Sequence, residues 1–399
     1  MKVRFVTLGC KVNAEETQQL REGLLRAGFV PAKEDEKADL TVVNTCSVTH
    51  LSDAKSRRSI EAAKREGGYV VVLGCYVTLH KDKMEGVDLY LDSENKEKAL
   101  EIILETFSLK RPLKLPEAEY HPRTRTYLKV QDGCDSFCSY CIIPFARGRA
   151  RSVAEEEILG LASRRIEEGF QELVLTGINL SRYGEDTGSS LLELIEKLAA
   201  LSPSRIRLGS IEQGIITDEF LKRMSGIRGF CDHFHLSLQS GSAKILRDMN
   251  RKYTPDEYEE KVHLIRGYFP KAAITTDIIV GFPTESEIEF MESMEFVRRI
   301  GFACVHVFAY SRREGTQAAK LPDLDPQIKK RRSARLRACA RQEQEKYLDS
   351  FVGEEVDVLF EDRGGLTPQY ARVEVDFPPP AGMIERRKII RREGLILRG

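Results

Sequence analysis

Residues 133–144 read GCDSFCSYCIIP, which places Cys134, Cys138 and Cys141 within eight residues. In a reducing compartment, thiols spaced this closely indicate a metal or catalytic site more often than disulfides. A structural zinc site requires four ligands, and no fourth cysteine or histidine lies nearby in the sequence. Three thiolates on a cubane iron–sulfur cluster leave one iron open to a small molecule. The stretch therefore predicts such a [4Fe–4S] cluster, with a zinc knuckle as the alternative.

The rest of the chain has an ordinary globular composition. Its 399 residues are 41% hydrophobic and 31% charged, with a formal net charge of zero, and this length is enough for two or three domains. No apolar run approaches the roughly 20 residues of a membrane span, and the N-terminal segment lacks the apolar region of a signal peptide. We therefore expect a cytoplasmic protein without a membrane partner.

Three more cysteines each follow a predicted strand. The strand-like segments KVRFVTL, DLTVVNT and YVVVLG alternate with helix-like segments, which predicts a parallel sheet. Cys10, Cys46 and Cys75 follow these strands directly and should meet at the carboxyl edge of the sheet, where ligands bind in such folds. We interpret them as a second shared metal site. The alternative is that each is a small buried apolar residue.

The second part of the chain predicts a barrel. A polar, proline-marked segment, LKRPLKLPEAEYHPRTR, is typical of a linker and should end near residue 120. Beyond it, strands and helices alternate, which favours a partial barrel of six βα units, open on one side. A basic helix over 326–349 and a β-rich tail, typical of a small β-barrel, follow. We expect an α/β fold with three domains, at 1–115, 120–349 and 350–399. The predicted barrel strands are YLKVQ, ELVLTG, RIRLGS, HFHLSL, AITTDIIVGF and CVHVFAY.

Several segments carry the spacing of helix N-termini, in which a Ser, Thr or Asn precedes a Glu by three residues. These pairs are Asn13 with Glu16, Ser152 with Glu155, Thr254 with Glu257, and Thr284 with Glu287.

The stretch GCDSFCSYCIIPFARGR resembles the CxxxCxxC signature of radical S-adenosylmethionine enzymes, whose core is a partial barrel of six units. In that family the open iron binds the amino and carboxylate groups of S-adenosylmethionine, and reductive cleavage then gives methionine and a 5′-deoxyadenosyl radical. The resemblance implies that Cys134, Cys138 and Cys141 hold this cluster. It also implies that Tyr140 packs against the adenine of S-adenosylmethionine.

The resemblance covers nearly the whole chain and extends to the methylthiotransferases. TLGCKVNAEET, VVNTCSVT and VLGCY are similar to their N-terminal domain, in which three cysteines hold an auxiliary [4Fe–4S] cluster; here these are Cys10, Cys46 and Cys75. HLSLQSGS, MNRKYT, DIIVGFPTES and FAYSRREGTQAA are similar to their core, and the tail resembles the RNA-binding TRAM domain.

Within this family the motifs look most like the branch that modifies N6-threonylcarbamoyladenosine in tRNA. The resemblance implies methylthiolation of C2 of this base at position 37, in the anticodon stem-loop, with two S-adenosylmethionine molecules per turnover. It also implies a reductant such as flavodoxin or ferredoxin, and it leaves the sulfur donor open. The alternatives within the family are isopentenyladenosine in tRNA and an aspartate of a ribosomal protein. A non-catalytic iron–sulfur sensor that binds RNA is the alternative of another class.

Polar residues at the ends of the barrel strands are further candidates. Thr176 and Gly177 end the second strand, where the family lets the backbone meet the methionine amino group. Ser210 and Glu212 follow the third strand, and Gln239 follows the fourth; these three are candidates for contact with cofactor or base. Such residues are also common at strand ends in barrels without ligands.

The remaining charged, thiol and imidazole side chains have weaker assignments. Arg147 and Arg149 are suited to a phosphate or carboxylate, or to solvated salt bridges. We interpret the other three cysteines as structural, and we expect His233 and His235, which alternate on one strand, to be core residues. The three cysteines are Cys231, Cys304 and Cys339.

Two basic segments are candidates for contact with tRNA phosphates, which Lys and Arg bind without base specificity. Between Gln327 and Asp349 there are eight Lys or Arg and three Asp or Glu. The tail segment RRKIIRR contains Arg386, Arg387 and Arg391. The alternative for the helix is an ordinary solvated, charged surface.

Overall fold

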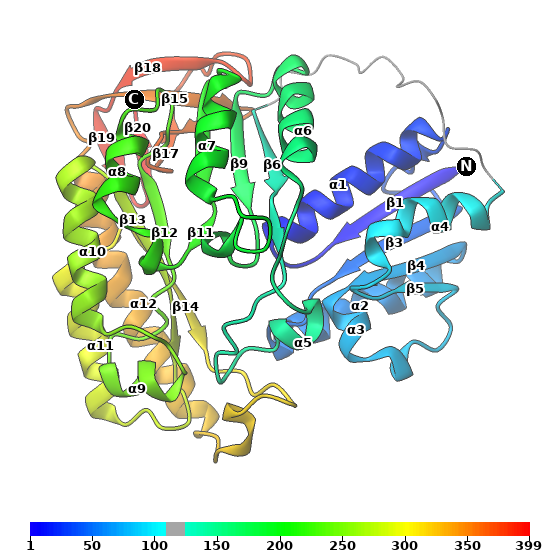
Figure 1. Cartoon of the computed structure of the whole chain (residues 1–399), viewed down its shortest axis with the longest axis horizontal. Coiled ribbons are helices and arrows are strands. Elements are labelled where there is room, and N and C mark those ends of the chain that lie inside the picture. The colour runs from blue at the N-terminus through cyan, green and yellow to red at the C-terminus, as the bar shows by residue number, and fades with distance from the viewer. Residues whose placement is uncertain (109–123) are drawn as a thin grey trace. The chain divides into compact units, whose positions relative to one another are not determined.

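The protein is described by a computed structural model, which covers residues 1–108 and 124–399. The predicted linker, which ends near residue 120, lies outside the described residues. The chain forms two compact units (Figure 1). Of the described residues, the first unit contains those of Met1–Glu119, Asp132–Arg151 and Ser311–Thr316, and the second contains those of Tyr120–Gln131, Ser152–Tyr310 and Gln317–Gly399. No helix in the described part of the chain is long and apolar enough to cross a membrane.

The first unit is built on a parallel sheet, as its alternating segments predict. Its strand order is β2-β1-β3-β4-β5, and every recorded pairing is parallel. The strands are β1 (Lys2–Thr7), β2 (Val30–Pro31), β3 (Leu40–Thr45), β4 (Tyr69–Gly74) and β5 (Leu89–Leu91). The helices are α1 (Lys11–Arg26), α2 (His50–Glu66), α3 (Cys75–Leu79), α4 (Ala99–Thr106) and α5 (Ile143–Arg147).

The two central strands of this sheet are covered on both faces. Val42 and Val71 belong to a core with α1 and α4, whereas Val43 and Val72 belong to a core with α2 and α3. All six residues of β3 are buried. Strands buried on both faces are often continuous apolar runs, as YVVVLG is. In LTVVNT the buried polar residues Asn44 and Thr45 lie at the carboxyl end, next to Cys46. The layers hold the carboxyl ends of β1, β3 and β4 in fixed positions.

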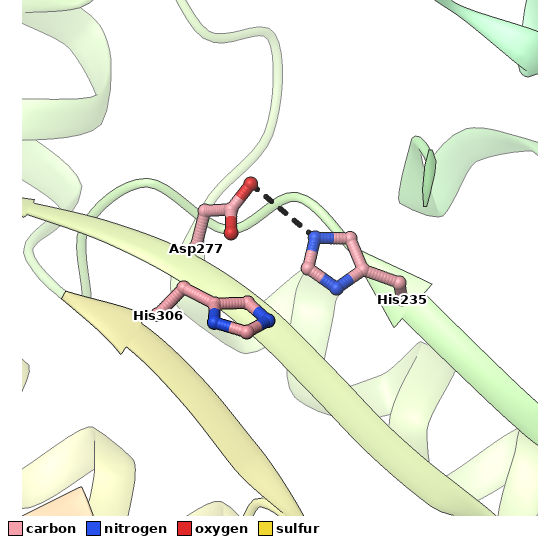
Figure 2. Close-up of side chains that lie close together, drawn as sticks. All are labelled: His235, Asp277 and His306. Atoms are coloured by element: carbon pink, nitrogen blue, oxygen red, sulfur yellow. Dashed lines mark ion pairs between the residues drawn. The ribbon is translucent and has the colours of Figure 1, made fainter. Parts of the chain in front are cut away.

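The second unit contains the six predicted barrel strands, but the third is broken. β6 (Arg125–Lys129), β9 (Glu172–Thr176) and β10 (Arg205–Leu208) form one parallel sheet. β11 (Ser210–Ile211), β12 (His233–Leu236), β13 (Ala273–Val280) and β14 (Cys304–Ala309) form another. The break falls at Gly209, where a Cβ atom would lie 2.8 Å from the carbonyl oxygen of Leu175. Figure 2 shows His235 on β12, Asp277 on β13 and His306 on β14, three neighbouring strands of the second sheet.

Helices follow the strands of this unit and pack on them. They are α6 (Glu155–Glu167), α7 (Leu191–Ala200), α8 (Asp218–Ser225), α9 (Ala243–Asp248), α10 (Pro255–Tyr268), α11 (Glu287–Ile300) and the basic α12 (Pro326–Asp349). Short strands β7 (Gln131–Asp132) and β8 (Arg151–Ser152) pair with each other.

The predicted helix starts have mixed outcomes. Thr254 and Glu257 form the predicted capping box of α10. At α11 the prediction is wrong by two residues, because Ser286 and Glu289 form the capping box there. Thr284 instead donates a hydrogen bond to Asp248. The helix start near Asn13 is confirmed, because α1 begins at Lys11, but Cys10 is its N-cap and the side chain of Asn13 is buried. The prediction for Ser152 is wrong, because α6 begins at Glu155 with Ala154 as its N-cap.

The tail forms a six-stranded mixed sheet with the order β18-β15-β16-β17-β20-β19. In the recorded pairing β18 and β19 are its two edges, so closure into a TRAM-like barrel stays a prediction. Its strands are β15 (Glu355–Glu361), β16 (Gly364–Leu366), β17 (Arg372–Glu374), β18 (Ile384–Lys388), β19 (Arg391–Glu393) and β20 (Ile396–Arg398).

This tail sheet is fastened to the amino ends of the barrel strands. The guanidinium of Arg205 donates to the carbonyl oxygens of Leu366 and Asp357 at 2.8 and 2.9 Å. Arg207 donates to the carbonyl oxygen of Pro368 at 2.7 Å and forms a buried two-point pair with Glu172 at 2.8 and 2.9 Å. The candidate residues Thr176, Ser210 and Gln239 lie at the carboxyl ends of the strands, the opposite edge.

Candidate functional site

The three strand-end cysteines of the first unit lie at one edge of its sheet. Cys10 follows β1 and is the N-cap of α1, Cys46 follows β3, and Cys75 follows β4 as the first residue of α3. β1 pairs with β3 and β3 pairs with β4, all in parallel. The three thiols therefore start from the carboxyl ends of three consecutive strands, as the sequence predicts.

Two features show how close these thiols are. A Cβ atom on Gly9 would lie 2.9 Å from Cβ and 3.2 Å from Sγ of Cys46, so only glycine lets the chain before Cys10 pass this cysteine. Burial raises the pKa of the Cys75 thiol; the Arg147 guanidinium opposes this effect, and the charges of Cys46 and Cys10 add to it. Thiols that affect one another electrostatically suit a shared metal ion or cluster.

The CxxxCxxC loop belongs to the same compact unit. Gly133 precedes it with φ of +70°, and a Cβ atom there would lie 1.8 Å from the carbonyl oxygen of Arg149. Cys134 donates its N–H to the carbonyl oxygen of Gly148 at 3.1 Å. The N–H of Ser136 points to Sγ of Cys134 at 3.4 Å. The loop is thus curled by a glycine turn and closed by a backbone bond, and one of its amides already faces a sulfur.

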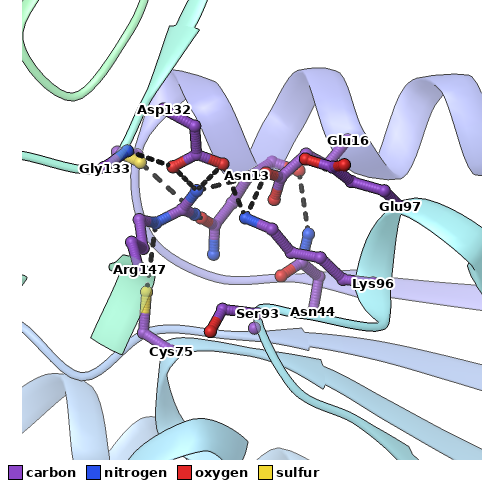
Figure 3. Close-up of polar contacts among 12 residues, drawn as sticks. Asn13, Glu16, Asn44, Cys75, Ser93, Lys96, Glu97, Asp132, Gly133 and Arg147 are labelled. Carbon is purple, nitrogen blue, oxygen red and sulfur yellow. Dashed lines mark hydrogen bonds and ion pairs between the residues drawn. The ribbon is translucent and has the colours of Figure 1, made fainter. Parts of the chain in front are cut away.

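Arg147 joins this loop segment to the first cysteine trio (Figure 3). It is buried, and its Nε donates to Sγ of Cys75 at 3.3 Å. Its Nη1 donates to Asp132 at 2.9 Å and to Glu16 at 3.1 Å. Lys96 contacts the same two carboxylates, each at 2.8 Å, so two cations face two carboxylates. We call these four charged residues the Arg147 network.

Asn13 connects this network to the remaining thiols. Its Oδ1 accepts from Nη2 of Arg147 and lies 3.6 Å from Sγ of Cys10. Its Nδ2 donates to the carbonyl oxygen of Leu8, two residues before Cys10, and to that of Thr45, directly before Cys46. Sequence reasoning interpreted Asn13 as a helix start and Arg147 as a phosphate ligand or a solvated ion pair. Both side chains instead hold the surroundings of the cysteines.

The barrel candidates are held by partners at the carboxyl edge of the second unit. Ser210 contacts the hydroxyl of Ser237 at 2.9 Å. Glu212 forms an ion pair with Arg251 at 3.1 Å, and Arg251 also donates to the carbonyl oxygen of Ser237 at 3.2 Å. Gln239 adopts a left-handed backbone with φ of +72°. Arg251 therefore links Glu212 to Ser237, the partner of Ser210. Arg251 was not among the predicted site residues, although it lies in the MNRKYT motif, which could have indicated it.

Thr176 and Gly177 lie at the end of β9. Thr176 is buried, and a Cβ atom on Gly177 would lie 3.1 Å from Cβ and Oε1 of Gln131. Gln131 Oε1 accepts the N–H of Asn179 at 2.7 Å, so the turn after β9 packs tightly on the residues that follow β6. This close approach favours a glycine here, because an added side chain would push Gln131 aside, whatever the turn binds.

Two family profiles and several known proteins match this chain. The Radical SAM superfamily profile matches residues 128–297, and the profile described as uncharacterized protein family UPF0004 matches residues 2–93. The threonylcarbamoyladenosine tRNA methylthiotransferase MtaB of Aquifex aeolicus is 38% identical over 97% of this chain and 99% of its own length. The protein of the same name from Bacillus subtilis is 36% identical over 90% of this chain and 85% of its own.

The chain belongs to the radical S-adenosylmethionine methylthiotransferase family. Another similar protein is the tRNA-2-methylthio-N(6)-dimethylallyladenosine synthase of Carboxydothermus hydrogenoformans, 34% identical over 82% of this chain and 80% of its own. A solved structure of similar fold is the radical S-adenosylmethionine methyltransferase TsrM of Kitasatospora setae, with cobalamin and a [4Fe-4S] cluster bound. Its TM-score is 0.60 and its identity 12%, over 80% of this chain and 74% of that one.

As a radical S-adenosylmethionine methylthiotransferase, the protein uses an iron–sulfur cluster and S-adenosylmethionine. The described residues fit a cluster at the CxxxCxxC loop. The glycine turn at Gly133 lets the loop curl, and the N–H of Ser136 is placed to donate to a thiolate of Cys134. Hydrogen bonds of this kind stabilise cluster ligands and adjust the reduction potential.

Proposed function

We propose that this methylthiotransferase modifies tRNA: it replaces the C2 hydrogen of N6-threonylcarbamoyladenosine at position 37 with a methylthio group. Four relatives named for threonylcarbamoyladenosine tRNA are 35% to 38% identical to it over at least 90% of its length. The observation that carries the proposal is that one compact unit holds both cysteine trios, with Arg147, six residues after Cys141, donating to Cys75.

In this proposal the two trios have separate tasks. Cys134, Cys138 and Cys141 hold the cluster that serves S-adenosylmethionine, with Tyr140 beside the adenine. Cys10, Cys46 and Cys75 hold a second [4Fe–4S] cluster, at which the sulfur is carried. Bound at Cys134, Cys138 and Cys141, S-adenosylmethionine would supply the radical that removes the C2 hydrogen, and a second molecule would supply the methyl group.

The protein's own residues orient these groups. Arg147 donates to Cys75, and this contact also suits a thiolate, so Cys75 needs little reorganisation on loading. The Cys10 thiol donates to Oδ1 of Asn13, and this contact ends when Cys10 binds iron as a thiolate. In the second unit, Thr176, Gly177, Ser210, Glu212 and Gln239 are proposed to bind S-adenosylmethionine or the base. Arg251 and Ser237 would position Ser210 and Glu212.

The tRNA is proposed to bind through phosphate contacts of Arg386, Arg387 and Arg391, and the target base would leave its stack to be modified. The side chains of Arg386 and Arg391 are 69% and 61% exposed. The basic helix α12 offers less than its composition suggests, because several of its cations form ion pairs within the protein. Lys329 pairs with Asp323, Arg332 with Glu285 and Arg335 with Glu287. A reductant such as flavodoxin or ferredoxin would supply the electron.

Dimethylallyladenosine in tRNA is a second candidate substrate. Relatives named for dimethylallyladenosine in tRNA are 31% to 34% identical to this chain. The same radical chemistry at C2 would serve that base. The two substrates differ at N6, so the products are separated by mass.

The test is nucleoside mass spectrometry of tRNA from a strain with and without this gene. Loss of 2-methylthio-N6-threonylcarbamoyladenosine, with accumulation of the unmodified precursor, supports the proposal. Loss of the dimethylallyl product instead would replace the substrate, and an unchanged nucleoside profile would overturn the proposal. In complementation, Cys134→Ala should restore nothing and should not form 5′-deoxyadenosine. Cys46→Ala should also fail but keep some S-adenosylmethionine cleavage; full methylthiolation by this variant would overturn the role of the first trio.

A further inference from the structure

Three neighbouring strands of the second unit bring two histidines and an aspartate together. His235 lies on β12, Asp277 on β13 and His306 on β14. In the parallel register, Asp277 is the partner of His306, and His235 is the partner of Thr275, two residues before Asp277 on the same strand face. Figure 2 shows the three side chains turned toward one another. One nitrogen or oxygen atom from each lies within 4.8 Å of the others.

The distances suit coordination of an ion. Nε2 of His235 lies 3.3 Å from Oδ2 of Asp277. Two ligand atoms at about 2.1 Å from a tetrahedral metal are separated by roughly 3.4 Å. Because the three residues come from paired strands, the sheet holds their backbone, and small side-chain rotations would bring ligand atoms that lie within 4.8 Å to coordinating separation.

The surroundings of His235 select the coordinating nitrogen. Its Nδ1 lies 3.0 Å from the hydroxyl of Thr275, a buried residue. A histidine that binds metal through one ring nitrogen usually donates the other N–H to an oxygen, which fixes the ring and its tautomer. The contact with Thr275 occupies Nδ1 and directs Nε2 toward Asp277.

We propose that His235, Asp277 and His306 bind one divalent transition-metal ion, with Zn²⁺ as the reference. Two imidazoles and one carboxylate favour Zn²⁺ and its neighbours over Mg²⁺ or Ca²⁺, which prefer oxygen ligands alone. Three protein ligands leave a position open for water or an oxygen of a bound molecule. His306 is exposed and the other two are partly exposed, so an ion has access. The three residues belong to the second unit, whereas both cysteine trios belong to the first, and the site replaces the expectation that His235 is a core residue.

The experiment uses the full-length protein with its iron–sulfur clusters rebuilt under anaerobic conditions, so that the six cluster cysteines are occupied. Co²⁺ is titrated and followed by visible absorption, and Zn²⁺ binding is measured by calorimetry. We expect one further equivalent of ion beyond the cluster iron. The bound Co²⁺ should show d–d bands without the intense thiolate charge-transfer bands of a cysteine site.

Variants locate the ion. His306→Ala and Asp277→Asn should each weaken Zn²⁺ binding at least tenfold. His263→Ala is the matched control, since His263 lies on α10 with a side chain 69% exposed and should leave the affinity unchanged. His306 is also exposed, so its replacement removes no buried group, and an unchanged melting temperature confirms folding. If Asp277→Asn does not fold, His306→Ala alone decides.

Three outcomes would overturn the site. They are no additional equivalent of ion, thiolate bands in the Co²⁺ spectrum, and equal affinity in the parent protein and His306→Ala. None of them depends on tRNA or on turnover, so the metal site fails or stands independently of the proposed function.

Discussion

Nε of Arg147 donates a hydrogen bond to Sγ of Cys75 across 72 residues of sequence, at 3.3 Å. Cys75 directly follows strand β4 as the first residue of α3, and Arg147 ends the short helix α5 that follows the CxxxCxxC loop. The charge of Arg147 is balanced by Asp132 and Glu16, and Cys75 and these two carboxylates raise the pKa of the buried guanidinium well above its ordinary value despite desolvation. Arg147 therefore stays charged at any physiological pH.

Arg147→Gln should strongly destabilise the first unit. The change leaves Asp132 and Glu16 with Lys96 and, at Asp132 alone, the partly exposed Arg151 at 3.3 Å. Breaking a buried ion pair typically costs about 3 kcal/mol or more. Urea unfolding of the parent and variant measures this loss. Arg149→Gln is the control, because the side chain of Arg149 is 77% exposed and its pair with Asp135 contributes little. Equal losses in the two variants would contradict a special role of Arg147.

Gly9→Ala should disturb Cys46 and lower the iron content of the first trio. The added methyl group would lie 2.9 Å from Cβ of Cys46, and the backbone at Gly9 has φ of +105°. Iron and acid-labile sulfide per chain after anaerobic reconstitution measure the effect. Gly28→Ala separates strain from the clash, because Gly28 has a similar φ of +92° but no atom near the added methyl group. Full cluster content in Gly9→Ala would argue against a cluster at this trio.

Glu289→Gln should weaken the start of α11 in a pH-dependent way. Glu289 accepts from the N–H of Ser286 at 2.7 Å and pairs with Lys244 at 2.9 Å. The Ser286 side-chain hydrogen bond, supported by Lys244, lowers the pKa of Glu289 from 4.5 to about 2. The folded state therefore binds this proton less tightly than the unfolded state, and the carboxylate stabilises folding above pH 4.5 and loses this effect as the pH falls toward 2.

The loss in Glu289→Gln should be about 1 kcal/mol near neutral pH, typical of a helix cap, and should shrink below pH 4.5. Thermal melts at pH 7 and pH 3 measure it. Glu292→Gln, an exposed change on the same helix, should have little effect at either pH. A loss that stays constant between these values would show that the capping carboxylate is not responsible.

Arg386→Glu combined with Arg391→Glu should weaken tRNA binding and reduce its salt dependence. Each lost phosphate contact lowers the slope of log affinity against log salt by about one. S-adenosylmethionine cleavage without tRNA should continue, because both residues lie on the tail sheet. Arg299→Glu is the control for a general change of charge, because this side chain lies on α11, outside both basic segments, and is 47% exposed. Unchanged tRNA affinity would remove the tail from the proposed RNA surface.

The strands and both cysteine trios were accessible from the sequence because their signals are local. The strand YVVVLG matches β4 residue for residue, and a cysteine after a strand can lie only at its carboxyl end. The Arg147 network could not be found in this way. Arg147 meets Asn13 across 134 residues, and neither residue differs in its local pattern from an ordinary cap or surface cation.

The broken third strand and the histidine cluster were missed for related reasons. RIRLGS continues as a strand by composition, and only the packing of Gly209 against Leu175 shows where it breaks. His235 alternates with His233 like a core residue, and Asp277 and His306 lie on the next two strands. Their proximity depends on strand register, which one sequence does not specify.

The tail sheet is held by arginines that donate to its main-chain oxygens at Asp357, Leu366 and Pro368. Every amino acid carries such an oxygen, so this attachment places almost no demand on which residues occupy those positions. The outward side chains of the tail are therefore free to diverge during evolution without detaching it. A family can in this way change what its terminal module recognises while the catalytic body remains unaltered.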